Sequence, residues 1–366
     1  MNRSILIISV LLIVCTILAG ACAATAPVQI PASPAPVSTP ADIVVAVENK
    51  TPLFSTEKIQ VPVWLSPGGR ADYTVATWLA RPKDGKDVIF ITVPGSTYGH
   101  TYWDFPYKPE IYSFVQTMSK AGYSSLNLDR MGSGESSKPS TDVTGEIQAR
   151  VIHQLVDGLR SGSIGGHPYR KIILVGHSLG SCVIIQEAAT YGDADGLIIT
   201  GLLHTQSFPG SGTTGLMNLS AAMQNSDTSD DPIFKGIPTP SYTTRPGMRS
   251  AIFYNPEQAD PEVVKIDEET KVTTPVAENS AFRSVVRTDE IRAPILLVVG
   301  ELDRLFSGPS ESLTLDKVRA GEKKYFQPST DLDFFVLPLS GHDINLQYNA
   351  PLWYEAAKTW VALKMP

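Results

Sequence analysis

The chain has 366 residues, 42% hydrophobic and 18% charged, and this balance is enough for a sizeable folded core. Its 30 Lys and Arg residues against 37 Asp and Glu residues give a net charge of -7, the wrong sign for a protein that binds by neutralising phosphates, so nucleic acid is not an expected partner. The three cysteines, Cys15, Cys22 and Cys182, can build neither a disulfide framework nor a cysteine-based metal site.

Residues 1–24 predict a secretory signal peptide. Arg3 supplies a short positive region, residues 5–18 are apolar, and small residues follow. The apolar run is short for a membrane-spanning helix, but an uncleaved signal anchor is an open alternative. Residues 18–22 resemble a bacterial lipobox whose leucine stands one place too early, so lipidation of Cys22 is a second open alternative. We expect a protein that is secreted or held in the cell envelope, with membrane attachment only through one of these two routes.

A tether and then one large domain are predicted after the signal. Residues 25–42 are rich in Pro, Ala, Ser and Thr and nearly uncharged, so they lack the apolar surface needed to fold. We assign residues 43–366 to a single domain that opens with a hairpin. Its two β-rich runs, 59–65 and 73–80, flank the turn-forming residues 66–69.

Short apolar runs and helical stripes then alternate along the domain. The stripes, in which apolar residues recur every three or four positions, lie at 111–118, 147–159 and 353–360. Such alternation predicts an α/β fold with a mostly parallel central sheet and helices on both faces. The runs typical of fully buried strands are 88–93, 125–128, 171–175, 196–203, 294–299 and 334–337.

One stretch, from about 204 to 284, interrupts the alternation. It is rich in Gly, Pro, Ser, Thr and Asp, yet it carries scattered aromatic residues and methionines. It is too long for a structureless loop in a compact domain, so we interpret it as an inserted cap with short helices, for example at 216–223.

The strand at 171–175 leads directly into Gly176-His177-Ser178-Leu179-Gly180, and an apolar helical run follows. A serine between two glycines at a strand-to-helix turn is typical of a nucleophile elbow. Ser178 is therefore the predicted nucleophile, and it needs a base to activate it.

The base can be found by elimination, because a triad on this kind of elbow follows the chain order serine, acid, histidine. Of six histidines, only His204 and His342 lie after the elbow. His204 precedes any plausible acid, whereas His342 follows the last predicted strand. We predict His342 as the base.

The acid is expected in the turn after the preceding strand, 294–299. Asp303 is our prediction and Glu301 the alternative. The acid would hold the imidazole tautomer and stabilise the imidazolium without taking the proton.

Acyl transfer also requires donors for the oxyanion. We predict the backbone N–H of Leu179 as one and that of Ser96, in the loop after strand 88–93, as the other. The following side chains are interpreted as pocket-lining residues, with ordinary packing as the alternative: Tyr98, His100, Tyr102, Trp103 and His204.

With these features the chain resembles the α/β-hydrolase superfamily over about residues 55–366. Residues 129–136 are similar to the family's Asp-Arg-x-Gly-x-Gly-x-Ser turn after the fourth strand. The resemblance implies a cofactor-free serine hydrolase that acts through an acyl-enzyme. Family members that use a nucleophilic aspartate, such as those resembling haloalkane dehalogenases and epoxide hydrolases, are disfavoured because Ser178 occupies that position.

Other chemistries have little support. Residues 210–215 match the dinucleotide pattern G-x-G-x-x-G, but no strand leads directly into them, and no metal-binding motif is present. We therefore expect no cofactor and no metal. The sequence predicts an exported hydrolase of carboxylic esters with an apolar group. The alternatives are a lipase, a peptidase, a carbon–carbon bond hydrolase, or a catalytically silent surface binding protein.

Overall fold

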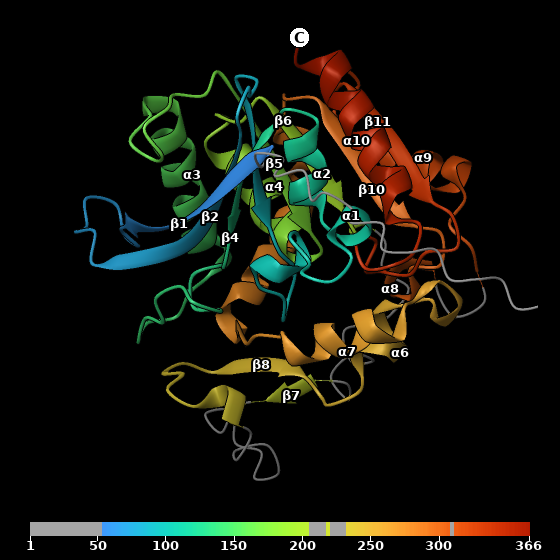
Figure 1. The fold of residues 1–366 in the computed structure, drawn as a ribbon, viewed down its shortest axis with the longest axis horizontal. Coiled ribbons are helices and arrows are strands. Elements are labelled where there is room, and N and C mark those ends of the chain that lie inside the picture. Colours follow the sequence, from blue (N-terminus) through green and yellow to red (C-terminus); the bar gives the residue numbers. More distant parts are fainter. Residues whose placement is uncertain (1–52, 205–216, 220–231, 308–310) are drawn as a thin grey trace, which may run out of the picture. The chain divides into compact units, whose positions relative to one another are not determined.

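The computed structural model describes residues 53–204, 217–219, 232–307 and 311–366 (Figure 1). The predicted signal peptide, its Cys22, the tether and the glycine-rich residues 210–215 lie outside the described residues. Within the described part of the chain, no helix has both the length and the apolar character needed to cross a membrane.

Eight strands form the main sheet, and their bounds follow the predicted runs closely. The strands are Phe54–Val63 (β1), Tyr73–Pro82 (β2), Val88–Val93 (β3), Ser124–Leu128 (β4), Lys171–His177 (β5), Gly196–Thr200 (β6), Ile295–Gly300 (β10) and Leu332–Leu337 (β11). Their order is β1-β2-β4-β3-β5-β6-β10-β11. Antiparallel pairing is confined to β1 with β2 and β2 with β4, so the predicted mostly parallel sheet is confirmed.

Helices cover both faces of this sheet (Figure 1). The α-helices are Pro109–Tyr112 (α1), Phe114–Lys120 (α2), Gly145–Ser161 (α3), Leu179–Thr190 (α4), Arg304–Ser307 (α8), Leu315–Glu322 (α9) and Ala350–Lys364 (α10). Short 3-10 helices lie at His100–Tyr102 (η1) and Lys323–Tyr325 (η6).

The two faces form two separate apolar cores, because successive strand residues point to opposite sides. Ile172 and Leu174 of β5 pack with α3 and α4, whereas Ile173 and Val175 pack with α2 and α10. Every residue of the central strand β3 is buried, as expected for a parallel strand covered on both sides.

The predicted stripe at 111–118 forms two helices rather than one. Ser113 adopts an extended conformation between α1 and α2, and its Oγ accepts a hydrogen bond from the N–H of Gln116. The same hydroxyl donates to Asp104 at 2.7 Å. An N-cap therefore interrupts the helix at a position where the apolar periodicity alone predicts continuity.

The segment between β6 and β10 has its own small sheet. Met217–Leu219 (β7), Ser241–Thr244 (β8) and Thr274–Pro275 (β9) pair in that order and are antiparallel. The prediction of a helix at 216–223 is wrong for residues 217–219, which are extended because they pair with β8, and the rest of that range lies outside the described residues. In the described part of the segment between β6 and β10, the helices are Pro232–Phe234 (η3), Arg249–Phe253 (α6), Pro256–Gln258 (η4), Pro261–Glu269 (α7) and Val276–Glu290 (η5).

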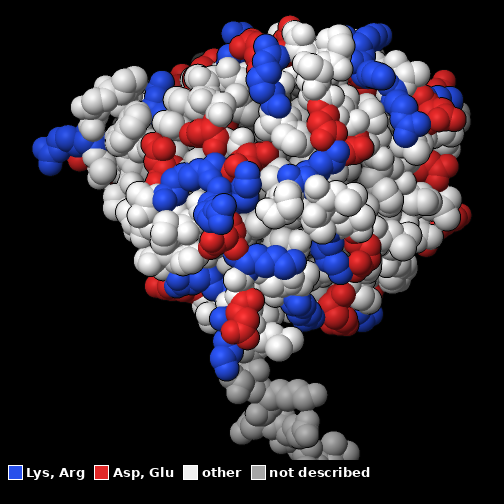
Figure 2. Space-filling model, turned by 90° about the horizontal axis from the view of Figure 1, so that it is seen from above, with Lys and Arg blue, Asp and Glu red and all other residues white. Residues whose placement is uncertain are grey.

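This segment returns to the main domain through η5, which packs along α4. The Ser284 hydroxyl donates to the backbone carbonyl of Cys182 at 2.6 Å, and the Cys182 thiol is buried. On the face seen in Figure 2, basic and acidic residues are interspersed rather than gathered by sign.

Candidate active site

Ser178 stands at a sharp turn between β5 and α4. Its φ of 51° lies in the left-handed region, which a non-glycine residue adopts only at a cost. Gly180 makes the turn possible, since a Cβ there would lie 2.3 Å from the carbonyl oxygen of Val93. The turn leaves Ser178 partly exposed at the end of a buried strand, as a nucleophile elbow requires.

His342 and Asp303 form a buried pair at the same edge of the sheet. The Nδ1–H of His342 donates to Oδ2 of Asp303 at 2.8 Å. The other carboxylate oxygen of Asp303 accepts the N–H of Leu305 at 3.1 Å, which fixes the carboxylate. This arrangement leaves Nε2 of His342 as a base. The alternative acid, Glu301, instead accepts a hydrogen bond from the N–H of Leu339 at 2.8 Å.

The Ser178 turn and the His342 imidazole both lie next to the end of β6, at Thr200 and Gly201. The N–H of Ser178 donates to the carbonyl of Thr200 at 2.9 Å, and a Cβ on the next residue, Gly201, would lie 3.1 Å from Cε1 of His342. The ring of His342 also lies 4.7 Å, centroid to centroid, from that of His177, the neighbour of Ser178. The structure thus brings all three predicted triad residues to one small region.

The loop after β3 lies directly against the nucleophile. A Cβ at Gly95 would be only 3.2 Å from Cβ of Ser178, so the backbone directly before Ser96 lies close to the Ser178 side chain. Leu179 is the first residue of α4, and its N–H has no acceptor within the helix. The two predicted oxyanion donors therefore come from segments that both contact Ser178.

Two buried arginines hold this loop in place. Arg130, from the turn after β4, donates through Nη1 to the carbonyls of Pro94 at 2.7 Å and Gly95 at 2.6 Å. Its charge is balanced by Glu278, which is likewise fully buried. The similarity of residues 129–136 to a family turn did not indicate this contact.

The second arginine, Arg249 of α6, reaches the loop from the inserted segment. Its Nη1 donates to Oγ1 of Thr97 at 2.9 Å, and Thr97 has a left-handed φ of 65°. Asp267 of α7 pairs with Arg249 through two hydrogen bonds of 2.9 Å. A bidentate pair fixes orientation as well as balancing charge, so Asp267 sets the position of the Arg249 guanidinium, which in turn restrains Thr97.

The surroundings of Asp343, the neighbour of His342, favour its protonated form. Nδ1–H of His177 donates to the Thr200 hydroxyl at 3.0 Å, since that hydroxyl donates its own proton to Gly176. Nε2 of His177 therefore presents a lone pair, and it faces Oδ1 of Asp343 at 3.5 Å. Neither atom has a hydrogen-bond partner, and a proton on Asp343 would allow one hydrogen bond to form between them. Burial, and then the charge of Asp267, raise the pKa of Asp343 to about 8.

The charge state of His342 follows from its surroundings. Burial alone lowers the pKa of this imidazole, but the charge of Asp303 and the hydrogen bond to it outweigh burial. The result is a pKa above the ordinary histidine value of 6.5. The imidazolium that forms during proton transfer is thereby stabilised.

Two apolar rings lie near the His342 imidazole. Phe253 of the inserted segment and Phe306 of α8 lie 5.6 Å and 6.2 Å from the ring of His342, centroid to centroid. Apolar and aromatic side chains of this kind predominate in the walls of small-molecule sites.

Three of the predicted pocket residues in the loop after β3 are buried, whereas the fourth, His100, is half-buried, stacks on Trp78 and contacts Asp129 through Nδ1 at 3.0 Å. Tyr98 is 3% exposed and donates a hydrogen bond to Asp343, so it belongs to the polar network under the site. Tyr102 stacks on His177 at 4.4 Å. Trp103 is fully buried and packs against Phe114 and Trp353, the ordinary packing that the sequence left as an alternative.

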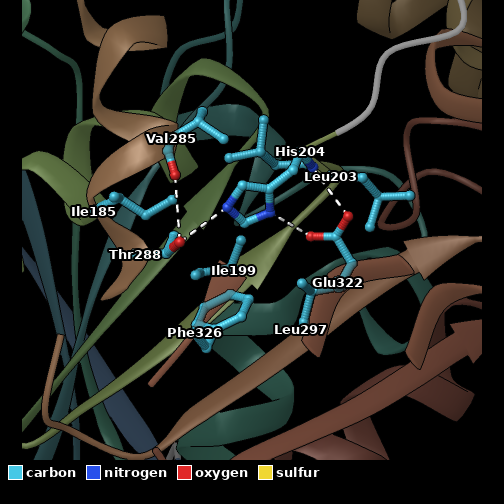
Figure 3. A pocket seen from close by; sticks show the side chains of 10 residues that line it. Ile185, Ile199, Leu203, His204, Val285, Thr288, Leu297, Glu322 and Phe326 are labelled. Carbon is cyan, nitrogen blue, oxygen red and sulfur yellow. Dashed lines mark hydrogen bonds and ion pairs between the residues drawn. The ribbon is translucent and has the colours of Figure 1, made fainter. Parts of the chain in front are cut away.

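His204 lines a different cavity, which none of Ser178, Asp303 and His342 lines (Figure 3). Its Nδ1 contacts Glu322, and its Nε2 lies 2.9 Å from the hydroxyl of Thr288. The rest of the cavity wall is mainly aliphatic, with Ile185, Ile199 and Leu297 among its members. The structure therefore separates His204 from the predicted triad.

Sequence reasoning missed Arg130, Arg249, Asp267 and the surroundings of Asp343 that favour its protonated form. A signal existed for one of them, since Asp343 directly follows the predicted base. The positions of Arg249 and Asp267 depend on how the inserted segment folds back, which no motif records.

Comparisons with known proteins place this site in context. A model of the alpha/beta hydrolase family matches residues 88–356. Among curated proteins, no sequence matches the chain.

Several solved structures are similar in fold. An esterase from Thermogutta terrifontis has a TM-score of 0.59 at 17% identity, and the match covers 85% of this chain and 100% of that one. A carboxyl esterase from Bacillus coagulans has a TM-score of 0.57 at 15% identity, covering 85% and 99%. A monoacylglycerol lipase from Paleococcus ferrophilus has a TM-score of 0.54 at 16% identity, covering 79% and 99%. These likenesses confirm the predicted fold, and because the family match spans most of the sequence, the chain belongs to the alpha/beta hydrolase family.

Proposed function

We propose that the protein is a serine hydrolase that cleaves carboxylic esters bearing an apolar group. The observation that carries this proposal is the buried His342–Asp303 hydrogen bond of 2.8 Å at the edge where the strained Ser178 turn stands. A serine becomes a strong nucleophile only beside such an oriented base. The esterase and lipase neighbours, although distant in sequence, are consistent with this chemistry.

The reaction follows from the positions of the groups. Nε2 of His342 accepts the Ser178 proton as the serine oxygen attacks the ester carbonyl, and Asp303 stabilises the imidazolium. The N–H groups of Leu179 and Ser96 hold the oxyanion. His342 then returns the proton to the departing alcohol, and an acyl group remains on Ser178. Water, activated by the same imidazole, releases the acid.

The apolar preference is inferred from the rings around His342. Phe253 comes from the inserted segment, so the segment contributes to the walls near the reacting centre. Hydrocarbon walls favour the apolar part of an acyl or alcohol group by about 25 cal/mol for each Å² removed from water.

The test is hydrolysis of p-nitrophenyl esters of increasing acyl length by the full chain, beside Ser178→Ala. We expect turnover that peaks at short to medium chains and falls by more than about 10³-fold in the variant. Circular dichroism checks that both proteins are folded. A peak at long chains would identify a lipase.

Labelling with a fluorophosphonate, followed by mass spectrometry, provides the second readout. We expect modification of Ser178 and none of Ser178→Ala. A folded protein that shows neither serine-dependent turnover nor labelling would overturn the proposal in favour of a surface binding role, whereas labelling without ester turnover would redirect the search to amides and carbon–carbon bonds.

We also propose that the protein is exported through the signal in residues 1–24. The mature N-terminus, determined by mass spectrometry from the native host, tests this. A lipid-modified Cys22 would identify a lipoprotein, and an unmodified start after Cys22 would identify free secretion. An intact Met1 on cytoplasmic protein would refute export.

A further inference from the structure

A second cluster of titratable side chains lies on the helices that cover the sheet, apart from the proposed triad. It comprises His153 of α3, Glu187 of α4 and Asp193 in the connection from α4 to β6. One ligand atom from each residue lies within 4.8 Å of the others. We name these three residues the α3–α4 cluster. We propose that the α3–α4 cluster binds a divalent transition-metal ion.

Glu187 provides the strongest indication. Its side chain is fully buried, and both of its carboxylate oxygens lack a hydrogen-bond partner. Glu187 takes part in none of the ion pairs formed by the described residues. A buried carboxylate without donors is costly, and proteins normally pair such groups or bind a metal with them.

Asp193 makes the need for positive charge greater. One of its oxygens, Oδ1, is also buried without a partner, and it belongs to the same small group as Glu187. Arg160 does not compensate, because it pairs with Asp195 and only donates to the backbone carbonyl of Asp193.

His153 is oriented as metal-binding histidines usually are. Its Nδ1 faces Asp193, and its Nε2 faces the carboxylate of Asp157 at 3.5 Å. A carboxylate on the far nitrogen fixes the tautomer and raises the basicity of the ligating one. The ring is held by stacking on Tyr191 at 3.9 Å.

The geometry also allows entry and binding. The side chains of His153 and Asp193 are each 24% exposed, so an ion can reach the cluster from solvent while Glu187 closes it from inside. Ligands bound to one ion at about 2.1 Å lie at most about 4.2 Å apart, so closure requires only small side-chain adjustments.

The ligand set selects the type of ion. Imidazole with carboxylates suits Zn²⁺ or Mn²⁺, whereas Ca²⁺ takes oxygen ligands in larger number. The sequence indicated no metal because the three residues come from two helices and a loop, at spacings that match no known motif. The ion would join α3 to α4, the helix that begins just after Ser178.

The test uses the purified full chain after removal of metals with a chelator. Zn²⁺ and Mn²⁺ are titrated by calorimetry, and thermal unfolding is followed with and without each ion. We expect one ion to bind at the cluster and to raise the unfolding midpoint. Glu187→Gln and His153→Gln should each lose this bound ion or bind it at least tenfold more weakly, and Asp157→Asn should bind it about tenfold more weakly.

A matched control is His167→Gln. His167 contacts Asp87 at 3.1 Å on the surface, as His153 contacts Asp193, but it has no buried carboxylate like Glu187 beside it. Replacing His167 should therefore leave the affinity for the metal ion unchanged. Ions held elsewhere on the chain, for example by His342, appear equally in all variants and are subtracted.

Two results would overturn the proposal. One is equal stoichiometry and affinity in wild type, Glu187→Gln and His153→Gln. The other is a wild type that binds neither ion, with Glu187→Gln more thermally stable in chelator. That second result would assign the cluster to a proton shared between Glu187 and Asp193.

Discussion

Two regions of the molecule combine a histidine, an aspartate in contact with it and a second buried carboxyl group. At the carboxyl edge of the sheet they are His342, Asp303 and Asp343, and on the helices they are His153, Asp193 and Glu187. At the sheet edge Tyr98, His177 and the Arg249–Asp267 pair surround Asp343, whereas no donor contacts Glu187.

The difference shows that residue types alone do not determine what such a trio does. Where donors and one arginine complete the network, the histidine bonds Asp303 through Nδ1 and can serve as the proposed base through Nε2. Where they are missing, the same kinds of groups keep buried carboxyl oxygens without hydrogen-bond partners, which an ion can ligate. Removing single elements of the sheet-edge network in turn tests this difference.

The largest effect is expected from Asp303→Asn. An asparagine in contact with Nδ1 favours the wrong tautomer of His342, so kcat for an ester should fall by about 10⁴-fold, equivalent to about 5 kcal/mol. Steady-state kinetics measure the loss. Glu301→Gln serves as the control, because its side chain contacts the Leu339 N–H instead and activity should stay within about twofold. A greater loss in Glu301→Gln would transfer the role of the acid to that residue.

Arg249→Met should be the most destabilising change at this edge. It leaves the carboxylate of Asp267 buried without its partner, which typically costs about 3–5 kcal/mol. Urea denaturation measures the free energy of unfolding. The double variant Arg249→Met/Asp267→Leu removes both charges and should regain most of the loss. If the double variant is no better than the single one, the charge pair is not the cause.

Asp343→Asn should change how stability depends on pH. Between the ordinary pKa of 3.8 and the folded value of about 8, folded Asp343 keeps a proton that the unfolded chain has lost. The free energy of unfolding therefore falls as pH rises, by up to about 1.4 kcal/mol per pH unit. The amide can donate to His177 and accept from Tyr98 at every pH, so the variant should lose this slope. Parallel wild-type and variant curves from pH 5 to 8 would refute a protonated Asp343.

Tyr242→Phe should have the smallest effect. The Tyr242 hydroxyl contacts Oγ of Ser96 at 3.0 Å and donates to Asn279 at 2.7 Å. Its loss removes one neutral restraint on the oxyanion loop, worth about 0.5–1.5 kcal/mol, so kcat should fall less than about tenfold with KM nearly unchanged. A fall comparable to that of Asp303→Asn would mean that the inserted segment takes a direct part in catalysis.

The sheet and the elbow could be predicted because both follow from short-range patterns. Strands buried on two faces give unbroken apolar runs. The end of β6 was misplaced because Gly201 takes a positive φ there while the apolar residues continue. The start of β1 was also misplaced, since the strand begins at Phe54 with mainly exposed residues that give no apolar signal. His342 could be identified because few histidines follow Ser178 in the chain. The structure brings His342 against Asp303, the acid that chain order indicated.

What could not be predicted depends on contacts between distant segments. Arg130 and Arg249 approach one loop from different parts of the chain, and no local pattern records that both end there. The break at Ser113 was missed because a polar cap can interrupt an apolar stripe without changing its period. His153 and Glu187 lie on different helices, so only their packing brings them together.

The buried thiol of Cys182 can report on the motion of α4, the helix that begins directly after Ser178. Burial raises the pKa of this thiol well above its usual range, so a thiol reagent can react only when α4 separates from η5 or the sheet. The other two cysteines, Cys15 and Cys22, both fall within the predicted signal peptide. A chain that has lost this peptide would carry Cys182 as its one thiol. The rate at which a reagent labels that thiol would then measure how often α4 opens, without any engineered probe.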